Sequence, residues 1–166
     1  MTVDLVTRVQ HPELDEAAYL ARIERLLALA GVSERELSVS WVDDAHIQSL
    51  NHQWRDRNRP TDVLSFEQGE VLEEILDGGP PAPLGDVVIS VERAEVQARE
   101  RDVSLGGVGY TLLDELTFLT LHGVLHLLGH DHENEAEAVV MEALEARIFA
   151  EFSAWPPRPH HREGAS

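Results

Sequence analysis

The segment Tyr110–Gly129, with the sequence YTLLDELTFLTLHGVLHLLG, is the most apolar part of the chain. It also contains two carboxylates and two histidines, at Asp114, Glu115, His122 and His126. Ionisable side chains are costly inside a lipid bilayer, so a membrane-spanning helix is disfavoured. The segment instead predicts a buried helix of a soluble domain.

Length and composition predict one globular domain. The chain has 166 residues, 43% of them apolar, which is enough to build a hydrophobic core. We predict a single domain over residues 1–153 and a disordered C-terminal tail over residues 154–166, where no core pattern is found. Met1–Gln10 is mixed and charged without a signal pattern, so we expect a cytoplasmic location.

Apolar periodicity predicts four strands and five helices. The strands are expected over Val3–Val9, Leu37–Val42, Asp62–Phe66 and Asp86–Val91. The helices are expected over Leu14–Ala30, Asp44–Arg55, Glu92–Arg101, Tyr110–Leu128 and Asn134–Phe152. An exposed excursion is expected over Glu67–Leu84. In the last helix, the side chains expected to face inward are Val139, Val140, Leu144, Ile148 and Phe152.

These elements predict an α+β fold of layered α/β type. A mixed four-stranded sheet, including a hairpin-like pair formed by the last two strands, is covered by about five helices. The strand order stays open, because neighbours along the chain need not be neighbours in a sheet.

Composition restricts the chemistry available to the chain. No cysteine is present, which excludes disulfides, thiolate zinc sites and cysteine nucleophiles, so any metal must be held by nitrogen or oxygen. The 13 basic side chains, all arginine, face 31 acidic ones, for a formal charge of -18. This balance argues against a protein that coats nucleic acid by bulk charge, but it leaves room for a small basic site.

A cluster of histidines follows the centre of the apolar helix in the motif HGVLHLLGHDH. His122 and His126 are four residues apart, so both imidazoles project from one face of the helix. Gly129 can adopt a left-handed conformation, which lets the chain turn back and present His132 as a third ligand. Three neutral imidazoles leave a fourth position open, the arrangement typical of catalytic zinc.

His130 competes with His132 for the third place, since it would continue the same face if the helix ran on. Because Gly129 predicts that the helix stops, we assign His122, His126 and His132 as the ligands of one Zn²⁺ ion per chain. His130 and Asp131 are then expected beside the metal, as groups that orient its ligands or transfer protons.

The spacing H-x-x-x-H-x-x-G-x-x-H is that of the metzincin peptidases, so the apolar helix is expected to be a zincin-like metal helix. Those peptidases carry a glutamate general base directly after the first histidine. Gly123 occupies that position here and has no side chain. A hydrolysis other than peptide cleavage is therefore favoured.

A second motif, NHQWRDRNRPTDVLSF, places Arg55, Arg57 and Arg59 within five residues. The planar guanidinium group binds phosphate through paired hydrogen bonds, so three arginines beside a strand are suited to a phosphodiester. The same charges would also be explained by a solvated helix end, where cations offset the helix dipole.

The motifs HGVLHLLGHDH, LNHQWRDRNRPTDVLSF and LGDVVIS together resemble the YbeY family of bacterial rRNA maturation factors, from about Leu37 to Phe149. The resemblance implies a zinc-dependent, single-strand-specific endoribonuclease involved in 16S rRNA 3′-end maturation and ribosome quality control. His122, His126 and His132 match the zinc ligands of the family, and Arg55 matches its arginine associated with activity and RNA binding. His130 stands where the family usually has tyrosine.

The implied partners are single-stranded RNA, the 16S rRNA precursor and the small ribosomal subunit; neither a membrane nor DNA is expected. In this hypothesis Arg55 stabilises charge on the phosphate, while His130 and Asp131 are the candidates for proton transfer. The attacking group can be water or the RNA 2′-hydroxyl. Three alternatives are a zincin-type metallopeptidase lacking its glutamate, a non-enzymatic ribosome assembly factor with structural zinc, and a small-molecule metallohydrolase.

Overall fold

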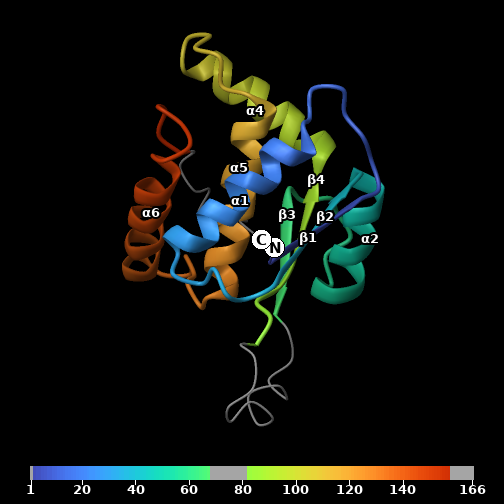
Figure 1. Ribbon diagram of the computed structural model, residues 1–166. Helices are drawn as coiled ribbons and strands as arrows, with labels where there is room; N and C mark the ends of the chain where they lie inside the picture. The colour runs from blue at the N-terminus through green and yellow to red at the C-terminus, as the bar shows by residue number, and fades with distance from the viewer. Residues whose placement is uncertain (1, 68–81, 158–166) are drawn as a thin grey trace.

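The computed structural model describes residues 2–67 and 82–157 (Figure 1). Most of the predicted excursion and residues 158–166 of the predicted tail lie outside these ranges. Within the described part of that tail, Arg101 donates hydrogen bonds to the carbonyl oxygens of Pro156 and Pro157, at 2.7 and 3.4 Å.

The described residues form four strands and five helices in the predicted order. The strands are β1 (Val3–Thr7), β2 (Leu37–Val42), β3 (Val63–Glu67) and β4 (Gly85–Ser90). The helices are α1 (Glu16–Leu29), α2 (Asp44–Arg55), α4 (Val91–Ser104), α5 (Leu112–Leu127) and α6 (Glu135–Phe149). The α+β architecture and the mixed sheet are therefore confirmed.

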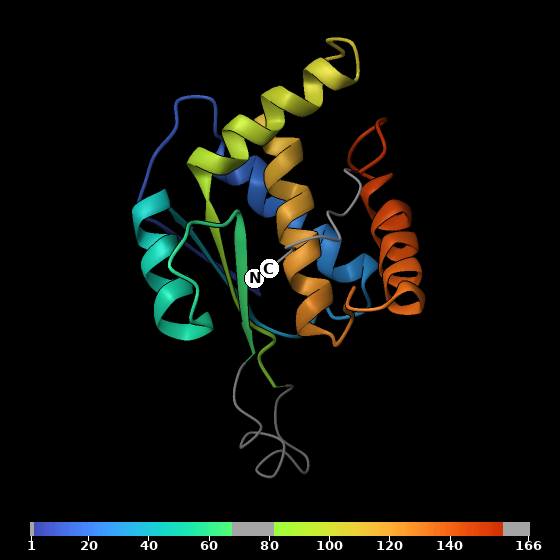
Figure 2. The same ribbon diagram turned by 180° about the vertical axis from the view of Figure 1, so that it is seen from behind.

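The strand order in the sheet is β1-β2-β4-β3. β1, β2 and β4 run parallel, whereas β3 pairs antiparallel with β4 and forms one edge. The register pairs Leu64 with Val88 and Phe66 with Asp86. The last two strands thus form the predicted antiparallel pair, and β3 is the strand that lies beside α5 (Figure 2).

Helices cover both faces of the sheet (Figure 1). α1 and α5 pack on one face, where Trp41, Val87 and Ile89 point into the main core. α2 packs on the other face, where Ile47 contacts a smaller apolar cluster that includes Leu64. α6 lies outside α5, so α5 is enclosed between the sheet and another helix.

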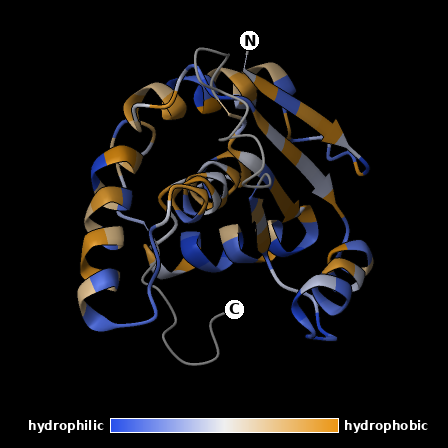
Figure 3. Ribbon diagram, turned by 90° about the horizontal axis from the view of Figure 1, so that it is seen from below, coloured by the Kyte–Doolittle hydropathy of each residue, from blue (hydrophilic) through white to orange (hydrophobic). Residues whose placement is uncertain are grey.

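The predicted central helix is confirmed as α5, which Figure 3 shows near the middle of the molecule and mostly hydrophobic. Both of its carboxylates make side-chain contacts at the N-terminal turn. Asp114 completes a capping box with Thr111 and pairs with Arg22 at 2.9 Å. Glu115 accepts a hydrogen bond from the Tyr110 hydroxyl. Throughout the described ranges, no helix has the length and apolar character needed to cross a membrane.

The predicted inner face of the last helix is partly wrong. Ile148 is buried, but Val139 and Val140 are 56% and 53% exposed. The buried side chains of α6 are Ala138, Met141, Glu145, Ile148 and Phe149. The helix is rotated relative to the purely apolar prediction because its buried face includes a carboxylate, Glu145, which has a partner on α5.

Candidate metal centre and active-site groove

The C-terminal end of α5 brings the three predicted metal ligands together. Gly129 has a φ of 96°, and the backbone N–H groups of Gly129 and His130 donate to the carbonyls of His126 and Leu125, both at 3.0 Å. These two bonds form a Schellman motif, which ends the helix and reverses the chain. The turn carries His132 back toward the helix face that presents His122 and His126.

The three imidazoles form a compact cluster. A nitrogen of each of His122, His126 and His132 lies within 4.8 Å of the others. The ring centroids are separated by 4.6, 5.2 and 5.6 Å. The sequence assignment of His132 rather than His130 as the third member of the cluster therefore agrees with the geometry.

Hydrogen bonds at the far side of two rings determine which nitrogens face the cluster. The Nδ1 of His126 lies 3.0 Å from the carbonyl oxygen of His130 and must donate to it, since a carbonyl only accepts. The Nδ1 of His122 lies 2.7 Å from the Oε2 of Glu145, a carboxylate oxygen that accepts its hydrogen bond. Both Nε2 atoms then face one space, 3.1 Å apart.

The electrostatic environment keeps His126 neutral. Burial lowers the pKa of His126 to about 4, with further lowering by the neighbouring His122 and His132 and partial compensation by Asp131. A neutral imidazole is the form that binds a metal ion. The low pKa of His126 therefore favours its metal-binding form.

The donor set fits a zinc ion. Two nitrogens bound tetrahedrally at ~2.0–2.1 Å would lie about 3.4 Å apart, close to the 3.1 Å between the Nε2 atoms of His122 and His126. Three imidazoles and no thiolate are the donor set expected of a catalytic rather than a closed structural zinc site. His122, His126 and His132 are the residues that would hold the ion.

Glu145 was not identified from the sequence. Its side chain is 1% exposed and its Oε2 contacts the Nδ1 of His122 from the opposite side of the ring. Metal-binding histidines characteristically donate their other ring nitrogen to such an acceptor. The available signal was the spacing of Glu145 from Met141 and Ile148, which places a carboxylate on a buried helix face.

Gly123 has a structural reason to lack a side chain. A Cβ atom at this position would lie 2.9 Å from both methyl groups of Val87 on β4. Gly123 therefore allows α5 to approach the sheet closely. A glutamate there would point into the sheet interface instead of the groove. The close packing of α5 on Val87 thus excludes the metzincin base at this position.

A large groove connects the histidine cluster with the arginine motif. It runs along β3 and α5 and has a volume of about 1970 Å³, larger than the ~300–1,000 Å³ typical of small-molecule pockets. All six residues predicted for the site line it. They are Arg55, His122, His126, His130, Asp131 and His132.

The charge of the groove differs from that of the whole chain. Five arginines line it: Arg55, Arg57, Arg59, Arg93 and Arg101. Five carboxylates line it as well: Asp62, Glu67, Asp86, Glu100 and Asp131. These charges cancel, so the excess of 18 negative charges belongs to the rest of the chain. A divalent cation at the histidines would make the groove positive.

Arg55 is held at the last turn of α2 by contacts with the edge strand. Its guanidinium group donates to the carbonyl oxygen of Ser65 at 2.7 Å and lies 4.7 Å from the centre of the Phe66 ring. The group is fixed in orientation while its side chain stays exposed to the groove.

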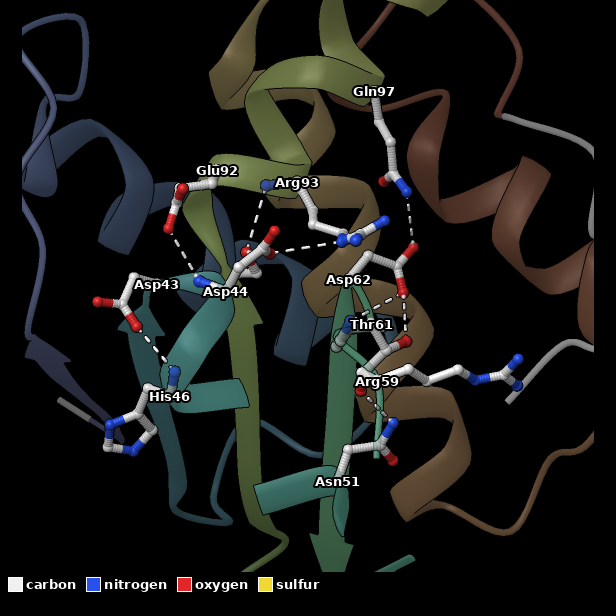
Figure 4. Close-up of polar contacts among 12 residues, drawn as sticks. Asp43, Asp44, His46, Asn51, Arg59, Thr61, Asp62, Glu92, Arg93 and Gln97 are labelled. Atoms are coloured by element: carbon white, nitrogen blue, oxygen red, sulfur yellow. Dashed lines mark hydrogen bonds and ion pairs between the residues drawn. The ribbon is translucent and has the colours of Figure 1, made fainter. Parts of the chain in front are cut away.

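Side-chain amides from α2 and α4 anchor the loop after α2 (Figure 4). The side-chain amide of Asn51 donates to the carbonyl of Arg59 at 2.9 Å, and Gln97 of α4 donates to Asp62 at 3.3 Å. The guanidinium of Arg59 extends away from the Asn51 contact in Figure 4. Arg57 and Arg59 are both exposed and both line the groove.

His130 and Asp131 lie beside the cluster in different ways. His130 acts on His126 through its backbone carbonyl, and its imidazole lines the groove. The Asp131 carboxylate accepts a hydrogen bond from the backbone N–H of His132 at 2.8 Å. Its negative charge also raises the pKa of His126, which opposes the lowering by burial and by the other two histidines.

Comparisons with known proteins identify the family of this chain. The family described as Endoribonuclease YbeY matches residues 5–153. The chain is 42% identical over 144 residues to endoribonuclease YbeY of Geobacillus kaustophilus, covering 82% of this chain and 88% of that protein. It is 38% identical over 156 residues to endoribonuclease YbeY of Bacillus cereus strain G9842, covering 89% and 96%.

The fold has also been seen in solution. A structure of a protein from Thermotoga maritima superposes with a TM-score of 0.55 at 22% identity and covers 99% of both chains. That similarity shows the fold, whereas the family match and the sequence identities establish the relationship. On this basis, the chain belongs to the endoribonuclease YbeY family.

Proposed function

We propose that the protein is a zinc-dependent, single-strand-specific endoribonuclease that acts in the cytoplasm on the 16S rRNA precursor. Its role would be 3′-end maturation and quality control of the small ribosomal subunit. The observation that carries the proposal is that three inward-facing imidazoles and a fixed arginine line one groove. Relatives named endoribonuclease YbeY supply the reaction class.

Arg55 has the geometry to bind the scissile phosphate. Two backbone carbonyls already orient its guanidinium, those of Ser65 at 2.7 Å and Trp54 at 3.4 Å. An arginine that is oriented in advance stabilises the negative charge that grows on phosphate oxygens in the transition state. A zinc ion at the histidines would supply Lewis-acid polarisation of a phosphoryl oxygen and acidification of water.

His130 and Asp131 are the proposed proton-transfer residues. Both line the groove beside the histidine cluster, and both are half-buried. A 2′,3′-cyclic phosphate on the product would identify the RNA 2′-hydroxyl as the attacking group, whereas its absence from the first product would identify water. Product analysis therefore decides which proton these residues remove.

The peptidase alternative loses support from two contacts. Gly123 faces Val87 in the sheet interface, so this position cannot carry a base into the groove. The carbonyl of Ser65 on β3 already accepts a hydrogen bond from Arg55, so this part of the edge strand is not open to an extended peptide.

A cleavage assay tests the proposal. Zinc-loaded protein is incubated with a single-stranded 16S rRNA precursor fragment, with the same fragment annealed to its complement, and with a peptide library. We expect cleavage of the single strand alone, a loss of at least about 100-fold in Arg55→Ala, and normal activity in Arg147→Ala, an exposed arginine outside the groove. Equal cleavage by wild type and Arg55→Ala, or peptide cleavage, would reject the proposal.

A further inference from the structure

We propose that Trp54, Phe66 and Arg55 form an aromatic platform that stacks one unpaired nucleobase of the RNA strand in the groove. This inference rests on the proposed function and deepens it, because it names the feature of the substrate that the site recognises. A platform of this kind selects single strands, since the faces of paired bases are covered by their neighbours.

The three side chains form one packed unit in the lining of the groove. The ring centroids of Trp54 and Phe66 are 6.3 Å apart with an interplanar angle of 68°, an edge-to-face arrangement. The Arg55 guanidinium lies over Phe66 at 4.7 Å. Trp54 and Arg55 come from the last turn of α2, and Phe66 comes from the edge strand β3. The platform thus connects the helix to the strand.

The exposure of Trp54 has no explanation within the fold. Its side chain is 59% exposed. Among the described residues, the other well-exposed large apolar side chains lie outside the groove: Val6, Val96, Val103, Val139, Val140 and Trp155. Trp54 is therefore the one described side chain of this kind that faces the same groove as the histidine cluster.

The surroundings of the platform suit a nucleotide rather than an apolar protein segment. Asp56 ends α2 in a left-handed conformation with a φ of 56°, and the backbone N–H of Arg57 bonds back to the carbonyl of Asn51. Arg57 and Arg59 follow this reversal, two and four residues after Arg55 in the sequence. Exposed arginines and an exposed tryptophan in the lining of one groove match a base attached to a phosphate.

Tryptophan fluorescence and oligonucleotide binding test the platform. The probe is a 2′-O-methyl phosphorothioate oligouridylate, which resists cleavage, added to zinc-loaded full-length protein. An abasic strand of the same length has the same charge but no bases. We expect the oligouridylate to quench the exposed Trp54 and the abasic strand to bind more weakly without quenching. Trp54→Ala should weaken oligouridylate binding by about tenfold and leave abasic-strand binding unchanged.

Matched variants separate stacking from other causes. Trp54→Phe should bind nearly as well as wild type, whereas Trp54→Leu, which keeps apolar area but no ring, should resemble Trp54→Ala. Trp155→Ala removes an exposed tryptophan outside the groove and should retain both the quenching and the affinity. Unfolding midpoints of the variants confirm that each is folded.

The outcomes distinguish the platform from the activity. Base-dependent quenching without RNA cleavage would support the platform and reject the proposed function. Cleavage with equal binding by wild type and Trp54→Ala, or equal quenching by the two strands, would reject the platform and leave the proposed function standing.

Discussion

At the residue scale, the contact between Glu145 and His122 decides how well a metal is held. The carboxylate fixes the ring and the position of its proton, so that Nε2 faces the other imidazoles. We predict that zinc affinity decreases about 10- to 100-fold in Glu145→Ala. Glu145→Gln should lie between wild type and alanine, because an amide oxygen still accepts from Nδ1–H but carries no charge. Competition with a chromophoric chelator measures the affinity.

The control for this prediction is Glu16→Gln, an exposed carboxylate on the first turn of α1, which should leave zinc affinity unchanged. Cobalt substitution adds a second readout, since its visible spectrum reports the symmetry of the ligands. An unaltered zinc affinity in Glu145→Ala would show that the bond to His122 has no part in metal binding.

At the element scale, the distance between α5 and the sheet depends on Gly123. Alanine there would bring its Cβ within 2.9 Å of the Val87 methyl groups, so Gly123→Ala should destabilise the protein by about 1–3 kcal/mol. In a Val87→Ala background the clash is absent and alanine favours the helix by about 1 kcal/mol, so the same change should become stabilising. Urea unfolding of the four proteins measures both effects; the same sign in both backgrounds would contradict the packing argument.

The C-terminal turn of α5 provides a second prediction at this scale. Gly129 and Gly31 have φ angles of 96° and 79°, and an added Cβ would meet no atom within 4 Å at either. Alanine at each should cost about 1 kcal/mol of stability through backbone strain alone. Only Gly129→Ala should also weaken zinc binding, since this turn positions His132. Equal zinc affinity in the two variants would mean that the turn does not control the third ligand.

Local sequence signals were sufficient for the elements and for the three histidines. An i, i+4 pair and a helix-ending glycine specify a geometry within eleven residues, from His122 to His132. The inner face of α6 was predicted less well because apolar periodicity assigns Val139 and Val140 to the core and assigns carboxylates to solvent. Glu145 is an exception because its hydrogen bond with His122 compensates for its burial. This contact joins two helices, so no local sequence pattern predicts it.

At the scale of the whole molecule, the sheet topology creates the groove. β4 lies between β2 and β3, so the edge strand that follows the arginine motif is placed against α5. This arrangement joins Arg55 with histidines that are far away in the sequence. Strand order depends on pairing across the fold, so local patterns identified the two motifs, while their joint action on one phosphate was expected only from the family resemblance.

The distribution of charge between the groove and the rest of the chain also belongs to this scale. Arginines and carboxylates cancel within the groove, while the rest of the chain carries the excess negative charge. Such a surface would repel RNA except at the groove, which a cation bound at the histidines would make positive. Selectivity would then depend on a strand that fits the groove, in agreement with a platform for one unpaired base.

The most direct test of the central claim is zinc reconstitution followed by RNA cleavage. Metal-free protein is titrated with zinc, and the cleavage rate of a single-stranded 16S rRNA fragment is measured at each step. We predict that activity rises in proportion to zinc and stops at one ion per chain, and that His126→Ala remains inactive at the same zinc concentrations. Full cleavage by the metal-free protein, or by His126→Ala, would contradict a metal-dependent ribonuclease centred on these histidines.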